Sequence, residues 1–264
     1  MKIRDAVQQW RRLEGLSRKP STQTYHEEIR EAVLNRWINH DQETSSVTVA
    51  ELETFVERVA HFSATRYNAI INCIKSFIPA AAQLRTRMVT AKERHNLSQP
   101  QFSGLLDELD QRPRSHSGLV VRFLSVTGLR IGAARKLKWT DVRDGYILAP
   151  AGVQKNSKPC MIPFVSGTME ILERLKKVTG DSEFILPQAS VKTALYKSCD
   201  RLGIPRLSHH DFRHLFATRC IESGVDLPTA ARWLGHQDGG ALLGKTYFHL
   251  ADAHSRKMAA LVRI

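Results

Sequence analysis

Two stretches in the first part of the chain place apolar residues three and four positions apart, the spacing of one face of an α-helix. They lie between Val49 and Val59 and between Tyr67 and Ile78, and a third, more charged helical candidate runs from Thr22 to Ile38. An amphipathic helix must bury its apolar face against another element, so these helices need one another as packing partners. We therefore expect residues 1–95 to form a small helical domain.

A basic connector ends this domain. Cationic side chains concentrate in it at Arg85, Arg87, Lys92 and Arg94, and we expect it to be exposed. A charged stretch of this kind has two interpretations, a solvated linker and a contact to phosphate groups. We place the domain boundary at its end, so that residues 96–264 form the second domain.

The second domain combines helices with a short hairpin. Two β-prone runs, Gly145–Ala149 and Met161–Phe164, flank a loop from Gly152 to Pro159. Short runs on either side of a glycine-containing loop predict an antiparallel hairpin, with Lys155 and Lys158 near its tip. The expected fold class is therefore mainly α with a small antiparallel β-sheet, in two domains.

Helical segments surround this hairpin. The stretch from Arg130 to Leu137 has helical spacing. A serine followed three residues later by an aspartate forms a capping-box pattern, which predicts a helix over residues 208–222. Pro228 then begins a further short helix that ends before Gly235.

The charge of the chain favours a polyanionic partner. The sequence contains 39 Lys plus Arg against 26 Asp plus Glu, a formal net charge of +13. Nucleic acid is the usual partner of such a chain, and the absence of a long apolar run gives no reason to expect a membrane partner. The four cysteines lie far apart without a CxxC pair, which is typical of reduced thiols and favours a cytoplasmic location.

Four short motifs in the second domain combine arginine, histidine and tyrosine. Guanidinium groups bind phosphate oxygens bidentately, imidazoles move protons near neutral pH, and a phenol can act as a covalent nucleophile. Together the motifs fit chemistry on a phosphodiester. They are Thr127-Gly128-Leu129-Arg130, Ser208-His209-His210-Asp211-Phe212-Arg213-His214, Leu234-Gly235-His236 and Thr246-Tyr247-Phe248-His249.

The second motif lies at the predicted start of a helix. His210 and Arg213 are three residues apart, so we expect both on one face beside the positive end of the helix dipole, a natural phosphate site. His209 and His214 are expected on other faces. A zinc site built on His210 and His214 is disfavoured, because the sequence offers no glutamate of an HExxH pattern and no distal ligand.

In their order and spacing, these motifs and Lys155 of the hairpin resemble the tyrosine recombinase (phage integrase) family. The resemblance runs along roughly residues 100–255, and the helices of residues 46–95 resemble the core-binding domain of that family. It implies a two-domain DNA clamp, in which a helical core-binding domain (1–95) accompanies a mixed α/β catalytic domain (96–264). The implied activity is site-specific recombination of DNA.

The resemblance also implies a role for each site residue. Tyr247 would attack the scissile phosphate and form a 3′-phosphotyrosyl intermediate. Arg130 and Arg213 would stabilise the charge of the transition state, and Lys155 would protonate the departing 5′-oxygen. His210 would act as general base or acid toward the tyrosine. A further imidazole, that of His236, would donate a hydrogen bond to the phosphate.

Partners and cofactors follow from the same resemblance. It implies double-stranded DNA as the substrate and a homotetramer assembled on that DNA. Neither a metal nor another cofactor is expected, because cationic side chains take the part that Mg²⁺ has in many phosphoryl transfers.

Some positions depart from the family pattern. Ala133 stands where an acidic residue that buttresses the site is common, and Pro159-Cys160 stands where many relatives have an arginine. The interval from His236 to Tyr247 is longer than in many members, because Gly239-Gly240-Ala241 lengthens the loop. Lys158 is an alternative to Lys155 as the lysine that enters the site.

Two other functions fit parts of the pattern. A type IB topoisomerase-like relaxase would use the same covalent chemistry without exchanging strands between two sites. A non-catalytic DNA-binding protein is the alternative from another class, since residues 216–234 resemble a helix-turn-helix. That alternative does not explain the presence of Tyr247 and Lys155.

Overall fold

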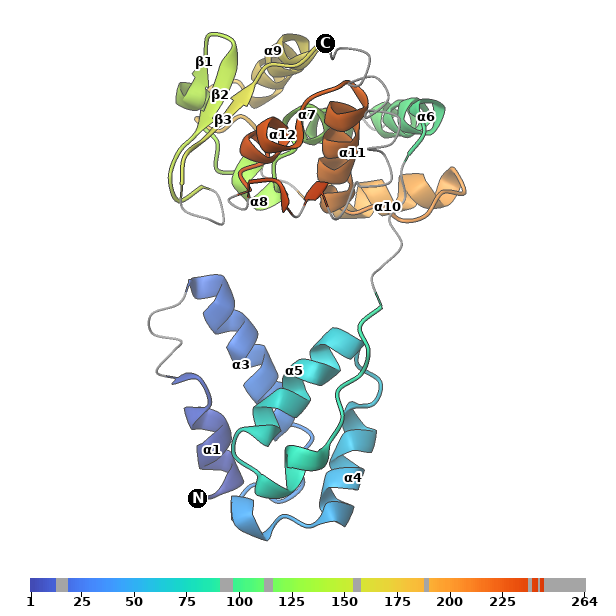
Figure 1. The fold of residues 1–264 in the computed structure, drawn as a ribbon. Coiled ribbons are helices and arrows are strands. Elements are labelled where there is room, and N and C mark those ends of the chain that lie inside the picture. Colours follow the sequence, from blue (N-terminus) through green and yellow to red (C-terminus); the bar gives the residue numbers. More distant parts are fainter. Residues whose placement is uncertain are drawn as a thin grey trace, which may run out of the picture. The chain divides into compact units, whose positions relative to one another are not determined.

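A computed structural model of the chain describes residues 1–12, 19–90, 97–111, 116–153, 158–187, 190–236, 239–241 and 243–244. The chain divides into two compact units, Met1–Lys92 and Glu93–Ile264 (Figure 1). Each unit has its own hydrophobic core. In the described part of the chain, no helix is both long and apolar enough to cross a membrane.

The first unit is helical, and its core is built from the predicted apolar faces. Leu52, Phe55 and Val59 of one helix and Ile70 and Ile74 of the next are at most 2% exposed. Local sequence fixes the helix starts, because hydroxyl side chains cap the first turns of α4 and α5. The helices are α1 (Ile3–Gln9), α3 (Pro20–Leu34), α4 (Val49–Val59) and α5 (Ala64–Lys75), joined by the 3-10 turns η1 (Thr44–Ser46) and η2 (Pro79–Gln83).

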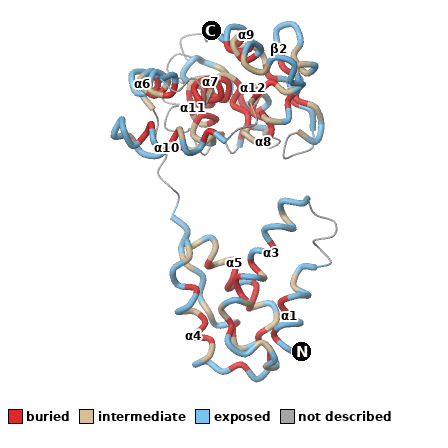
Figure 2. Tube along the Cα trace, turned by 180° about the vertical axis from the view of Figure 1, so that it is seen from behind, coloured by how far each residue is buried: buried red, intermediate tan, exposed pale blue. Residues whose placement is uncertain are grey.

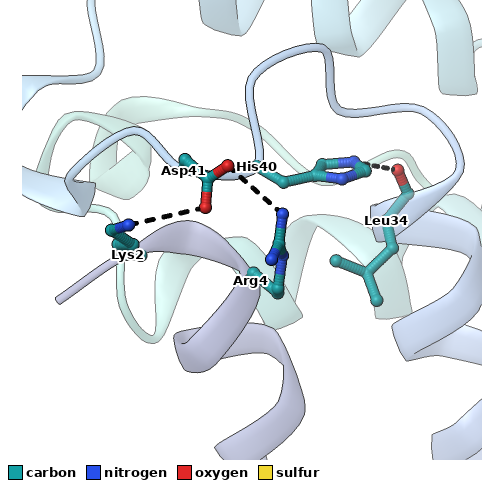
Figure 3. A network of polar contacts seen from close by, with 5 residues as sticks. All are labelled: Lys2, Arg4, Leu34, His40 and Asp41. Carbon is teal, nitrogen blue, oxygen red and sulfur yellow. Dashed lines mark hydrogen bonds and ion pairs between the residues drawn. The ribbon is translucent and has the colours of Figure 1, made fainter.

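A polar network holds the start of the chain against the loop that follows α3 (Figure 3). The Asp41 carboxylate forms ion pairs with Lys2 at 3.6 Å and with Arg4 at 3.3 Å. The Nε2 of His40 donates to the carbonyl of Leu34 at 2.7 Å, at the last residue of α3. Because surface ion pairs contribute little, burial of the apolar face of α1 is the main force that docks it.

The basic connector is fastened to the first unit at Arg87. The amide nitrogen of Asn68 donates to the carbonyl of Arg87 at 2.8 Å, and the Arg87 backbone N–H donates to the Asn68 side-chain oxygen at 2.7 Å. The Arg87 guanidinium donates to the carbonyl of Ala60 at 2.8 Å and lies 3.9 Å above the ring of Tyr67. The prediction that the connector is exposed is therefore wrong for Arg87, because its guanidinium makes tertiary contacts. Arg85 is exposed, while Lys92 and Arg94 lie outside the described residues.

Removing the paired amide should loosen this segment. We expect Asn68→Ala to lower the free energy of unfolding of the first unit by about 1–3 kcal/mol, because two backbone groups of Arg87 lose their partner. Trypsin should then cut after Arg85 and Arg87 faster than in the wild type. Asn72→Ala, which removes an exposed asparagine from the same helix, is the matched control. Equal cleavage rates in both variants would show that the two hydrogen bonds do not hold the segment.

The second unit is mainly helical and carries one small sheet. Its three strands are antiparallel in the order β1-β2-β3, with Ile147 opposite Ile162 and Ala149 opposite Cys160. The predicted hairpin and the predicted fold class, mainly α with a small antiparallel sheet, are thereby confirmed. The elements are α6 (Gln99–Asp110), α7 (Ser117–Thr127), α8 (Ile131–Ala134), η4 (Trp139–Asp141), β1 (Val142–Arg143), β2 (Tyr146–Ala149), β3 (Cys160–Pro163), α9 (Thr168–Thr179), α10 (Lys192–Arg201), α11 (His209–Glu222) and α12 (Leu227–Trp233).

Helix α7 forms the centre of this unit (Figure 2). It is buried around most of its circumference, and α6, α9 and α11 pack against it. A helix that is apolar on all sides needs such neighbours to cover it. The end of α7, where the Thr127–Arg130 motif begins, is thus fixed by the core.

Helix α8 is shorter than the sequence pattern predicts. Helical spacing runs from Arg130 to Leu137, yet the helix covers only Ile131–Ala134. The chain leaves the helix to pair with a distant segment, because the Leu137 carbonyl accepts from the N–H of Ile185 at 3.0 Å. The apolar residue that completes the pattern is still buried, but by tertiary contact.

Candidate active site

The start of α11 is fixed by the predicted capping box. The backbone N–H and the hydroxyl of Ser208 donate to the Asp211 carboxylate at 2.6 and 2.7 Å, and the Ser208 hydroxyl accepts from the N–H of His210 at 3.3 Å. These contacts satisfy polar groups that a helix end leaves unpaired. They also fix the register of His210 and Arg213 in the first turns of the helix.

Arg213 is buried and ties together two distant parts of the chain. Its side chain is only 3% exposed. One terminal nitrogen donates to the carbonyl of Gly128 at 2.8 Å, and the other donates to the carbonyl of Leu234 at 2.7 Å. Gly128 lies at the end of α7 and Leu234 at the end of α12. The guanidinium of α11 therefore joins the Thr127–Arg130 motif to the Leu234–His236 motif.

Gly128 allows these helices to approach closely. Its φ of +62° lies in the left-handed region, which residues with a β-carbon rarely adopt. A β-carbon at this position would lie 2.5 Å from a ring carbon of Phe216 and 2.6 Å from a methyl of Leu234. The glycine is thus required both by the turn and by the packing of α11 and α12 against it.

Arg130 lies two residues beyond this glycine and caps the N-terminus of α8. Its Nη1 is buried, and no hydrogen-bond partner for it exists among the described residues. Burial lowers the pKa of the guanidinium, but an arginine stays protonated in a protein at neutral pH. The arginine is partly exposed, and the unsatisfied buried donor costs free energy in the folded protein.

The Leu234-Gly235-His236 motif closes α12. Gly235 adopts a φ of +68°, its N–H donates to the Arg232 carbonyl at 2.9 Å, and the N–H of His236 donates to the Ala231 carbonyl at 2.8 Å. This pair of bonds is a Schellman ending, in which glycine takes the left-handed position. It places His236 two residues after Leu234, whose carbonyl Arg213 holds.

Cys160 fastens the hairpin to the same helix end. Its thiol lies 3.1 Å from the carbonyl oxygen of Arg232 and 3.3 Å from that of Trp233. Burial raises the pKa of this thiol, so it stays protonated and donates to these carbonyls. Where many relatives have an arginine, this chain thus has a contact between β3 and α12. Sequence reasoning did not find this contact because its partners lie more than seventy residues away.

The histidines of α11 differ from the expectation. The rings of His210 and His214 are in contact, with centroids 4.6 Å apart at an angle of 83°. Placing His214 on another face from His210 was therefore wrong, because residues four apart differ by only about 40° around a helix. His210 and Arg213, which were expected on one face, also differ in burial: the His210 side chain is exposed and the Arg213 side chain is buried.

His209 is held in a different environment. Burial, together with the nearby charges of Arg135 and Lys192, lowers the pKa of His209 below its ordinary value. Its imidazole is therefore neutral near pH 7. Its Nε2 is buried without a hydrogen-bond partner in the described part of the chain.

Four of the six predicted site residues lie on the segments that Arg213 joins or on α11 itself. Arg130, Arg213 and His236 belong to the three joined motifs, and His210 lies one turn before Arg213. Lys155 and Tyr247 lie outside the described residues, and Lys158 is exposed next to β3. Within the described ranges, no group of three or more His, Cys, Asp or Glu side chains could hold a metal ion.

This arrangement of a mainly helical unit, a small antiparallel sheet and three joined motifs defines a known class of DNA-acting proteins. Residues 95–254, more than half of the chain, match the model of the phage integrase family. The chain belongs to this family, which is the family of the tyrosine recombinases. A curated relative is the tyrosine recombinase XerA of Pyrococcus furiosus, 25% identical over 198 residues that cover 68% of each protein.

Solved structures share the fold at lower identity. The Tn1549 transposon integrase in complex with transposon right-end DNA aligns with a TM-score of 0.76 and 16% identity, covering 98% of this chain and 100% of that one. A lambda integrase tetramer bound to a Holliday junction aligns with a TM-score of 0.71 and 18% identity, covering 91% of this chain and 79% of that one. At these identities the likeness shows the fold.

The role of Gly128 can be measured by adding one methyl group. We expect Gly128→Ala to lower the free energy of unfolding by about 2–4 kcal/mol, from the left-handed φ and from overpacking against Phe216 and Leu234. Urea denaturation at constant m-value measures this change. Gly132→Ala is the matched control, since a β-carbon there meets nothing within 4 Å. A Gly128→Ala variant as stable as Gly132→Ala would contradict the close approach.

Proposed function

We propose that this chain is a site-specific DNA recombinase that cleaves and rejoins double-stranded DNA through a 3′-phosphotyrosyl intermediate. The observation that carries this proposal is the buried Arg213, which joins the motifs of Arg130 and His236. Family membership and the net charge of +13 agree with it.

The proposed reaction exchanges one phosphodiester for another. The hydroxyl oxygen of Tyr247 attacks the scissile phosphorus and forms a phosphotyrosyl bond, while the bond from phosphorus to the 5′-oxygen breaks. His210 accepts the phenolic proton, and Lys155 gives a proton to the departing 5′-oxygen. Attack by the 5′-hydroxyl of another strand reverses these transfers, so no nucleotide hydrolysis is needed.

Stabilisation of negative charge is the task of the remaining residues. Arg130, which is partly exposed, would bind a non-bridging phosphate oxygen through its guanidinium. Arg213 would place a second positive charge beside the phosphate while keeping its two carbonyl contacts, and His236 would donate a hydrogen bond. Because the carbonyl contacts fix these groups before DNA binds, they need no reorganisation during the reaction.

We further propose that residues 1–95 form a core-binding domain, that residues 96–264 form the catalytic domain, and that four copies assemble on DNA. Exchange between two duplexes cuts four strands, which requires four nucleophiles. The shared fold with the lambda integrase tetramer on a Holliday junction supports this assembly. In this arrangement both domains contact the same duplex.

A covalent adduct tests the nucleophile. Duplexes bound by the full chain are first selected from a random double-stranded library, and a nick near the cleavage position then traps the intermediate. We expect wild-type protein to form an adduct that resists denaturation and is destroyed by protease. Tyr247→Phe should form none while binding the duplex with unchanged affinity, because it loses only the attacking oxygen.

The outcomes separate the competing functions. An adduct that persists in Tyr247→Phe would remove Tyr247 as the nucleophile. Wild-type binding without any adduct would favour a non-catalytic DNA-binding protein. Relaxed plasmid without exchanged strands from two sites would favour the topoisomerase-like relaxase.

Arg130 offers a test that separates catalysis from folding. We expect Arg130→Ala to slow adduct formation by about 10²–10³-fold, the effect of losing one preorganised donor. Its free energy of unfolding should not fall, because the guanidinium has a buried donor for which the described residues offer no partner. Lys136→Ala removes an equal charge from an exposed position nearby and should cleave normally. Near-normal cleavage by Arg130→Ala would contradict the assignment.

A further inference from the structure

We infer that His214 is a positioning residue that holds the imidazole of His210 in place for proton transfer. This inference rests on the proposed function, and it adds a residue for which the sequence pattern predicted a different location. The observation that carries it is the contact between the two rings, with centroids 4.6 Å apart and planes at 83°.

The edge-to-face geometry explains how one ring can restrain the other. Aromatic rings prefer offset or edge-to-face contacts at centroid distances of about 4.5–7 Å, because the ring edge carries positive and the face negative charge. His210 is exposed on the first turn of α11, and its side chain can occupy only rotamers that its neighbours leave open. The ring of His214, one turn further along the helix, excludes rotamers of His210 that would occupy the same space.

His214 is a suitable anchor because its own helix is rigidly packed. It is half-buried, and its neighbours Phe212, Arg213 and Leu215 are 0%, 3% and 7% exposed. Because the helix is held by the core, the His214 side chain has a fixed position against which the exposed ring of His210 can pack. The first turn of α11 is further fixed by the Ser208–Asp211 capping box.

Proton transfer is sensitive to this kind of restraint. A general base must come within hydrogen-bond reach of the proton, and misplacement by about 1 Å can cost about 10²-fold in rate. His209 cannot substitute for His210, since its Nε2 is buried. A restraint on the one exposed imidazole at this helix start would therefore appear in the rate of cleavage and not in DNA affinity.

Two substitutions separate ring packing from the chemistry of an imidazole. We expect His214→Ala to slow single-turnover cleavage of the selected nicked duplex by about 10–100-fold at saturating protein. His214→Phe, which keeps a ring but has no N–H, should retain the rate within about threefold. Both variants should bind the duplex as the wild type does. His61→Ala is the matched control, because His61 also packs against a ring, that of Phe62 at 4.2 Å, in the other unit.

A second measurement needs no DNA. The ring-proton NMR resonances of His210 in the full chain, assigned with a His210→Gln variant, should shift in His214→Ala and stay near the wild-type position in His214→Phe. Unchanged resonances in His214→Ala would overturn the inference, even if the wild type formed no adduct. Equal loss of rate in the Ala and Phe variants would also overturn it, because an imidazole N–H would then be required at position 214. A wild type without an adduct, with the resonances shifted as expected, would remove the proposed recombinase function and leave the ring contact standing.

Discussion

The buried guanidinium of Arg213 joins three parts of the chain that are distant in the sequence. Its donors reach the carbonyls of Gly128 and Leu234, which lie 85 and 21 residues away. Bonds from a charged donor are stronger than those between neutral groups, and breaking them would leave a charge buried without a partner. The ends of α7 and α12 must therefore stay beside α11, and the other features of the site depend on that constraint.

Several short contacts make this arrangement possible. Gly128 removes the side chain that would collide with Phe216 and Leu234, and Gly235 ends α12 so that the chain turns directly into His236. The thiol of Cys160 holds the last carbonyls of α12 against β3. The site is thus supported from the hairpin as well as from the helices. This thiol belongs to the Pro159-Cys160 pair, which stands where many relatives have an arginine.

The two arginines differ in how the protein satisfies their donors. Both terminal nitrogens of Arg213 donate to backbone carbonyls, whereas Arg130 keeps a buried nitrogen that the described residues leave without a partner. Leaving a buried donor unsatisfied costs free energy in the folded protein. In the proposed reaction both cations act on the phosphate, and Arg213 also holds the ends of α7 and α12 together.

Local sequence determined the helix starts, the hairpin and the four motifs. Capping boxes, glycine endings and short β-prone runs act over a few residues. The helix start at Ser208, the helix end at Gly235 and a hairpin of residues 145–149 and 161–164 could therefore be predicted from the chain alone, and the observed strands differ from these runs by one residue. Tertiary structure decided the burial of Arg213, the early end of α8 at Ala134 and the thiol contact of Cys160. Each of these depends on partners far along the chain, and only packing of the whole unit brings such partners within hydrogen-bond distance.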